Sequence, residues 1–210
     1  GSSGTILSCA RRLNVLENQF RTVTLSNNAT SNAVCRGGSV TFSAALNSPA
    51  DNPVYTWTVN GTVDNSTTGS TLILSPTTNP TVVSVSLSSS SGCLANAQGS
   101  TLSNSVTVNN NPSNFIVNGG GGYCAGGTGV SVTLSGSETG VTYTLLRGGV
   151  STGTTTTGTG SGLTFSNITT VGNYTISASN ASGCSATMGS SANISINALA
   201  TAGFDIPNDV

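Results

Sequence analysis

Apolar residues recur at every second position in several short runs in the first half of the chain. These runs are Val40, Phe42, Ala44 and Leu46; Tyr55, Trp57 and Val59; Val83, Val85 and Leu87; and Val106 with Val108. A period of two is the signature of a β-strand with one buried face. No stretch of ten or more residues shows a helical period. The first half is therefore predicted to be all-β.

The second half repeats this pattern. Its runs are Val130, Val132 and Leu134; Val141, Tyr143 and Leu145; Leu163 and Phe165; Tyr174, Ile176 and Ala178; and Ile194 with Ile196. Turn signals such as Asn60-Gly61 separate the runs, and prolines stand between them. About seven short strands in each half is the pattern of a β-sandwich. We predict two tandem sandwiches.

Two sequence motifs occur once in each half. Val34–Gly38 (Val-Cys-Arg-Gly-Gly) is echoed by Tyr123–Gly127 (Tyr-Cys-Ala-Gly-Gly), and Ser90–Cys93 is echoed by Ala181–Cys184. The two cysteines of each half are almost equally far apart. A repeat that keeps a cysteine pair predicts two copies of one domain, each closed by a disulfide. The expected pairs are Cys35–Cys93 and Cys124–Cys184.

The tract Asn109-Asn110-Asn111-Pro112 marks the domain boundary, because Asn favours turns and Pro blocks strand pairing. The predicted parse is an N-terminal extension over 1–23, a first domain over 24–110, a second over 111–197 and a tail or linker over 198–210. Gly119–Gly122 is predicted to be a flexible entry into the second domain, since no Gly-Lys-Ser/Thr follows as in a phosphate loop. Thr154–Thr157 is interpreted as a solvated hairpin loop.

Charge is scarce in this chain. Charged residues make up 5% of it, against about 25% in a typical soluble domain. The net charge is −1, which gives no attraction to nucleic acid or to an anionic membrane. The chain has no His and no Lys, so a Ser-His or Ser-Lys nucleophile is excluded. The six acids are widely spread and suggest no glycosidase pair. We therefore predict no catalytic residues and no enzyme.

Cysteines in this chain indicate disulfides and not metal. Zinc sites use closely spaced Cys and His, a pattern that is absent here, and neither Asp51 nor Asp64 has the close acidic partners of a calcium site. No metal and no cofactor is expected. Disulfides form in oxidising compartments, so an extracellular or cell-surface location is predicted. No run of 18 apolar residues occurs, which predicts no membrane insertion.

The order Cys35, Trp57, Cys93 is similar to the core of an immunoglobulin-type domain, where an indole packs near a disulfide. In the second copy, Tyr143 takes the place of Trp57. The spacing departs from antibody domains, because the second cysteine is predicted to lie past its strand, in the following hairpin.

Several segments resemble repeats of one protein family. They are Tyr123–Val130, Leu134–Tyr143, Leu145–Gly149 and Gly172–Thr175 in the second copy, and Val34–Gly38 with Tyr55–Gly61 in the first. They resemble the Ig-like and PKD-like repeats of large secreted surface proteins of the Bacteroidota, which include gliding-motility adhesins exported by the type IX system. The resemblance covers about residues 24–197. It implies a β-sandwich at the cell surface and carries over no catalytic residue.

The N-terminal segment differs in composition from the rest. It holds three of the five arginines, and its apolar side chains and one cysteine are Leu13, Val15, Leu16, Phe20 and Cys9. One interpretation is an ordinary first strand with an inert or unmatched thiol. The other is an extension that contacts another subunit by adding a strand to an open sheet edge, with Cys9 able to lock that contact.

These observations favour a non-enzymatic extracellular structural or adhesive protein, in one variant the subunit of a self-assembling surface fibre. Its expected partners are other copies of itself, neighbouring repeat modules or a surface polysaccharide. The alternative is a carbohydrate-binding or spacer module of a secreted enzyme. Sugar binding usually needs an exposed aromatic platform, but Tyr55, Trp57, Tyr143 and Tyr174 have core-like positions. Only Tyr123 is expected to be free.

Overall fold

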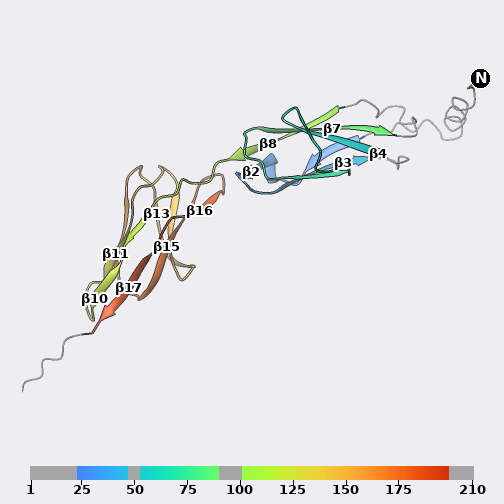
Figure 1. Ribbon diagram of the computed structural model, residues 1–210. Coiled ribbons are helices and arrows are strands. Elements are labelled where there is room, and N and C mark those ends of the chain that lie inside the picture. The colour runs from blue at the N-terminus through green and yellow to red at the C-terminus, as the bar shows by residue number, and fades with distance from the viewer. Residues whose placement is uncertain (1–22, 47–52, 90–100, 199–210) are drawn as a thin grey trace, which may run out of the picture. The chain divides into compact units, whose positions relative to one another are not determined.

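The chain folds into two compact units, and the boundary between them in the sequence falls between Asn110 and Asn111. The computed structural model describes residues 23–46, 53–89 and 101–198, and Figure 1 shows the strands of both units. The regular elements of these residues are β-strands and one short 3-10 turn, Thr30–Asn32. No helix in the described part of the chain has the length and hydropathy needed to cross a membrane. The predicted all-β fold of two sandwiches is confirmed.

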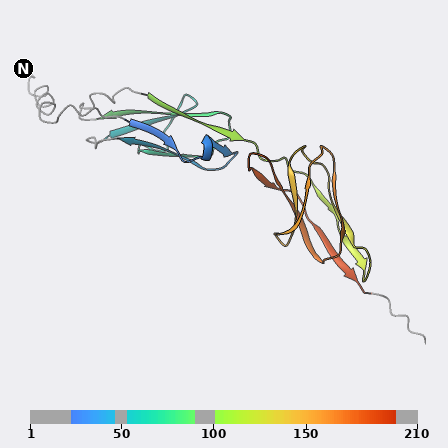
Figure 2. The ribbon, with the colours of Figure 1, turned by 180° about the vertical axis from the view of Figure 1, so that it is seen from behind.

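The first unit consists of two sheets, one of three strands in the order β1-β3-β6 and one of five in the order β2-β8-β7-β4-β5. Its strands are β1 (Val23–Asn27), β2 (Ala33–Cys35), β3 (Val40–Leu46), β4 (Pro53–Val59), β5 (Thr62–Asp64), β6 (Thr71–Leu74), β7 (Thr81–Ser89) and β8 (Thr101–Asn109). The two sheets face one another, as Figure 2 shows from behind.

The core of the first unit is built from the side chains that the period of two predicts. Trp57 is completely buried and packs with Phe42, Leu72 and Val85, among others. Its indole Nε1–H donates a hydrogen bond of 2.9 Å to the backbone oxygen of Gly69, so the one polar atom of the ring is satisfied. The prediction that Trp57 lies between the sheets is confirmed.

The second unit also has two sheets, ordered β14-β11-β9 and β10-β17-β15-β12-β13, with β16 paired to β15. Its strands are β9 (Val117–Gly119), β10 (Gly121–Cys124), β11 (Val130–Leu134), β12 (Thr142–Arg147), β13 (Val150–Thr157), β14 (Leu163–Ile168), β15 (Gly172–Ser179), β16 (Ser185–Thr187) and β17 (Ala192–Asn197). Thr154–Thr157 therefore belongs to strand β13, and the predicted hairpin loop is wrong.

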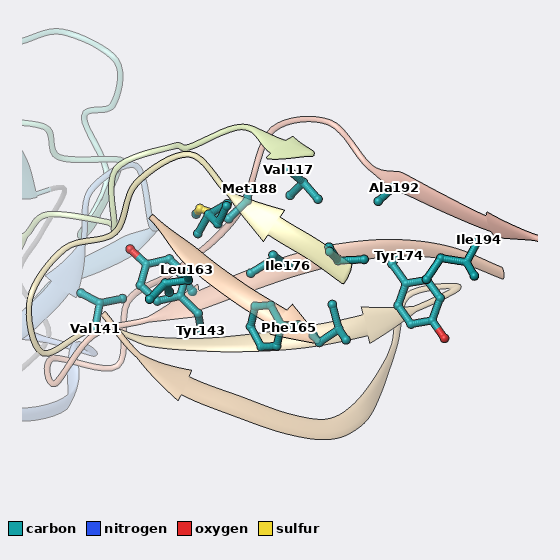
Figure 3. Packing of buried hydrophobic residues seen from close by; sticks show 14 residues of the cluster. Val117, Val141, Tyr143, Leu163, Phe165, Tyr174, Ile176, Met188, Ala192 and Ile194 are labelled. Carbon is teal, nitrogen blue, oxygen red and sulfur yellow. The ribbon is translucent and has the colours of Figure 1, made fainter. Parts of the chain in front are cut away.

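Two tyrosines anchor the core of the second unit. Tyr143 and Tyr174 are buried and lie towards opposite ends of the cluster in Figure 3. Tyr143 Oη accepts a hydrogen bond of 2.9 Å from the backbone N–H of Glu138, and Tyr174 donates one of 2.7 Å to the backbone oxygen of Thr170. A buried phenol needs such a partner. Tyr143 thus fills the place that Trp57 fills in the first unit.

The first strand of each unit changes sheets. In the second unit Gly119 pairs with β11 of one sheet, and Gly121 pairs with β17 of the other. Gly119, Gly120 and Gly121 have φ of +90°, +76° and +104°, a conformation that glycine adopts readily and other residues rarely do. The predicted flexible entry at Gly119–Gly122 is therefore wrong: the tract is an ordered crossing between sheets.

The repeat seen in the sequence is a repeat in three dimensions. Cys35 ends β2 and Cys124 ends β10, and each of these strands runs parallel to the last strand of its unit. Each is followed by the same tight turn, in which the N–H of Gly38 or Gly127 donates to the oxygen of the preceding cysteine at 2.8 or 2.9 Å. The Val-Cys-Arg-Gly-Gly motif and its echo thus encode one strand end.

Candidate functional site: an open groove in the second unit

Two edge strands border one side of the second sandwich. Within the described residues, β13 is the last strand of the five-strand path and β14 is the last strand of the three-stranded sheet. On the opposite side the first strand crosses from sheet to sheet as β9 and β10. An edge strand presents unpaired backbone N–H and C=O groups. The side bordered by β13 and β14 is therefore the open side of this unit.

A groove of about 500 Å³ lies at this side. Its lining residues are Leu145, Arg147, Val150, Ser151, Thr152, Thr154, Phe165, Ser166, Asn167, Ile168, Thr169, Thr170 and Tyr174. Leu145, Phe165 and Tyr174 are buried core side chains, whereas Val150 is 72% exposed. The accessible surface of the groove is therefore mainly hydroxyl and amide groups, with the exposed methyl groups of Val150 at its border and the apolar core beneath.

Both bordering strands contain a bulge. In β13 the register with β12 shifts between Thr144 and Leu146, where Gly153 has φ of +81°. In β14 the register with β11 shifts beside Asn167, which has φ of +58°. A bulge interrupts the regular ladder and bends the strand. The bulges therefore oppose the pairing of another strand along the whole length of either edge. A strand could pair only with the stretches that flank the bulges.

The groove carries one charge. Arg147 is its single charged lining residue, and no acidic residue lines it. The aliphatic part of the Arg147 side chain packs over Gly172, where a Cβ would lie only 3.0 Å from Arg147 Cγ. The stem can thus lie along the sheet while the guanidinium stays in water. A ligand with one carboxylate matches this charge.

The cysteine pairing predicted for the second unit is not formed. Cys124 carries a free, exposed thiol, whereas Cys184 is buried and disulfide-bonded. Cys124 lies at the end where β15 begins, and Cys184 follows the other end of that eight-residue strand. Strands rise about 3.3 Å per residue, so roughly 25 Å separates two ends that a disulfide needs within about 7 Å.

Cys184 does lie past its strand, in the turn between β15 and β16, as predicted. Cys35 is disulfide-bonded, but its predicted partner Cys93 lies outside the described residues, so that pairing stays a prediction. The predicted inter-subunit contacts also lie outside the described residues. They are Cys9, Leu13, Val15, Leu16 and Phe20.

Cys124 is expected to react with iodoacetamide in the native, unreduced protein, because its thiol is exposed and free. Peptide mapping without prior reduction should find the label on Cys124 and none on Cys184. A Cys124→Ser variant, whose mapped labelling should lack this one site, is the control. Recovery of a Cys124–Cys184 linked peptide would instead restore the pairing predicted from the sequence.

Aromatic side chains form no exposed platform in the described part of the chain. Tyr55, Trp57, Tyr143 and Tyr174 are buried, as predicted. Tyr123, which was expected to be free, packs against the core of the second unit and donates its hydroxyl to the backbone oxygen of Thr169. The aromatic surface that usually stacks on a sugar ring is therefore missing from these residues.

Acidic groups do not gather in the described residues. No cluster of three or more His, Cys, Asp or Glu side chains occurs among them. Hydrogen bonds from the hydroxyl and the backbone N–H of Ser66 hold the pKa of the Asp64 carboxyl below its ordinary value. The Asp64 carboxylate thus accepts hydrogen bonds within its own turn.

The groove could not be found from the sequence, because β13 and β14 belong to different sheets. Period-two patterns identify each strand but do not say which two edges border the same side of the sandwich. The bulges contain Gly153 and Asn167, which adopt positive φ. These two residues are the local sequence features that could have indicated the bulges. Neither residue type is specific enough to predict a groove.

No protein-family model matches the chain, and no curated protein matches it. The matching solved structures include fibronectin(III)-like modules of Clostridium thermocellum CbhA, at 13% identity and a TM-score of 0.41, covering 84% of this chain and 95% of that one. A Ca²⁺-stabilised adhesin of an Antarctic bacterium matches at 18% identity and a TM-score of 0.38, covering 87% and 50%. The Yersinia pseudotuberculosis adhesin InvE matches at 16% and 0.33, covering 82% and 58%. Likenesses this distant say nothing of what the chain binds.

Proposed function

We propose that this chain is a non-enzymatic structural or adhesive protein of the cell surface, and that it assembles by strand addition. In this proposal the groove of the second unit accepts an extended segment of a neighbouring copy. The resemblance to Ig-like surface repeats of the Bacteroidota supports the extracellular setting, as do the disulfide-bonded Cys35 and Cys184. The observation that supports assembly by strand addition is the groove between the two unpaired edges of β13 and β14.

Strand addition fits the groove for two reasons. The outer edges of β13 and β14 leave backbone groups that an extended chain can satisfy with main-chain hydrogen bonds. Between them, exposed Val150 offers an apolar contact, and the hydroxyl groups of the lining offer polar ones, to the side chains of alternate residues. Main-chain bonds supply affinity in this mode of recognition, and these side-chain contacts supply register.

The N-terminal segment of a second copy is the proposed occupant. Leu13 and Val15 are two positions apart, so an extended segment presents both on one face. Glu17 follows at the next position of this face and is the only acidic residue of the segment. A carboxylate there is complementary to Arg147, the one charge of the groove.

A Thr154→Arg variant is expected to abolish assembly, because Thr154 lines the groove and a bulky cation there would occupy it. Deleting residues 1–20 should have the same effect. Both proteins should keep two folded units by circular dichroism and thermal unfolding. Sedimentation velocity and negative-stain electron microscopy measure assembly.

Thr155→Arg is the matched control. It places the same charge on the next residue of β13, outside the groove lining, and should assemble normally. A full-length protein that stays monomeric at every concentration tried would overturn the proposal. So would assembly that survives both Thr154→Arg and the deletion.

A further inference from the structure

The outer face of the larger sheet in the second unit, over β16, β15, β12 and β13, is a regular array of hydroxyl groups. The strand register places four of them side by side in each of two successive rows. The rows are Ser185, Ser179, Thr142 and Thr157, and Thr187, Ser177, Thr144 and Thr155. All eight side chains are exposed or half-buried, because they alternate with buried residues such as Tyr143 and Ile176. This surface, defined by the eight residues, is called the hydroxyl face below.

The hydroxyls of this face are available to a ligand. None of the eight side chains has a hydrogen-bond partner within the described protein, in contrast to the groove residue Thr152, which donates to the backbone oxygen of Leu145. A Ser or Thr hydroxyl is one donor and two acceptors. The face therefore offers an ordered lattice with about 4.8 Å between strands and roughly 6.6 Å between rows.

The first unit carries a related face on its own five-stranded sheet. Register again aligns small uncharged side chains, as in the row Val63, Thr58, Ser84 and Ser103. Val54, Val63 and Val82 are 43%, 51% and 37% exposed there, so methyl groups stand among the hydroxyls. The hydroxyls of Ser84 and Ser103 hydrogen-bond to each other at 2.7 Å, so the first unit shares the lack of charge in these rows but not the unpartnered hydroxyls.

No charged residue takes part in these rows. The acids and arginines of the described chain lie elsewhere: Glu138 is in a loop, and Arg147 shares the inward side of β12 with Tyr143 and Leu145. A face without charge has no long-range electrostatic attraction for ionic polymers, and each of its hydroxyls can both donate and accept a hydrogen bond. The partner that this chemistry fits is a neutral polymer that presents hydroxyl and C–H groups at regular intervals.

We infer that the hydroxyl face is a binding surface for a neutral, insoluble polysaccharide. Each hydroxyl contributes little by itself, and affinity arises from many aligned contacts. Such binding needs no aromatic platform and no groove, and it is independent of the assembly proposed above.

Retention on microcrystalline cellulose and on chitin, measured by depletion from solution, tests this inference. Native protein should bind at least one of the two and should not bind the anionic polymer alginate. Thr155→Arg and Thr142→Arg should each weaken retention by about tenfold or more, since each would bury an unpaired charge against the polymer. Thr155→Ser, which keeps the hydroxyl, should retain most of the binding.

Thr154→Arg separates this inference from the assembly. It should abolish assembly but leave retention on polysaccharide unchanged, whereas Thr155→Arg should do the reverse. Failure of native protein to bind either neutral polysaccharide would overturn the inference. So would retention that Thr155→Arg and Thr142→Arg leave intact while both variants keep the unfolding profile of native protein.

Discussion

Replacing Trp57 by alanine is expected to destabilise the first unit by about 3–5 kcal/mol. Trp57 is completely buried at the centre of the first core, so the change removes the largest apolar contact of the unit and leaves a cavity. It also leaves the backbone oxygen of Gly69 without its indole donor. A cost of this size is a large share of the stability of a small domain.

Chemical unfolding followed by circular dichroism and by tyrosine fluorescence measures this effect. The transition of the first unit should move to lower denaturant, while that of the second should stay in place because its core is separate. Val54→Ala is the control, since Val54 lies on an outer strand face and is 43% exposed; it should cost little. A Trp57→Ala protein as stable as native would mean that the indole does not hold the sheets together.

Replacing Gly120 by alanine is expected to destabilise the second unit by about 3–5 kcal/mol, a size reserved for a few kinds of mutation. Two costs combine. A residue with a side chain is strained by about 1–3 kcal/mol at the positive φ of Gly120. Its Cβ would also stand 2.6 Å from the backbone oxygen of Asn193, which cannot move without shifting β17.

Comparison with Gly126→Ala separates the two costs. Gly126 has a similar φ of +82°, but a Cβ there meets nothing within 4 Å, so this variant should pay the strain alone. The difference between the two free energies of unfolding measures the collision. Equal destabilisation by both variants would show that the crossing has room to relax, and that tight packing against Asn193 does not constrain it.

The core could be predicted from the sequence because burial in a sandwich follows one local rule. Residues two apart on a strand share a face, so Phe42, Trp57, Tyr143 and Ile176 were identified from spacing alone and are all buried. The repeat was equally visible, because the same tight turn needs the same Gly-Gly after Cys35 and Cys124. Both inferences depend on short-range information.

What was missed depends on long-range arrangement. Equal cysteine spacing revealed the repeat, but it could not show that parallel pairing carries Cys124 to the end of the sandwich remote from Cys184. The sequence predicts a flexible entry at Gly119–Gly122 because it does not distinguish flexible glycine from glycine held at positive φ. The prediction of a loop at Thr154–Thr157 fails because β-propensity depends on neighbouring strands, and here β12 pairs with this segment.

The parallel pairing of first and last strands has a mechanical consequence. In the second unit the chain passes through β9 into β10 and leaves along β17. β10 and β17 lie side by side and run in the same direction over four residue pairs. Tension between the chain ends therefore pulls the two strands past each other, and their evenly spaced hydrogen bonds must break together and not one after another. Forced unfolding is governed by the unfolding rate, which such a shear contact is expected to lower. β2 and β8 form the same contact over three pairs in the first unit, so tension along the chain is expected to meet a shear contact in each repeat.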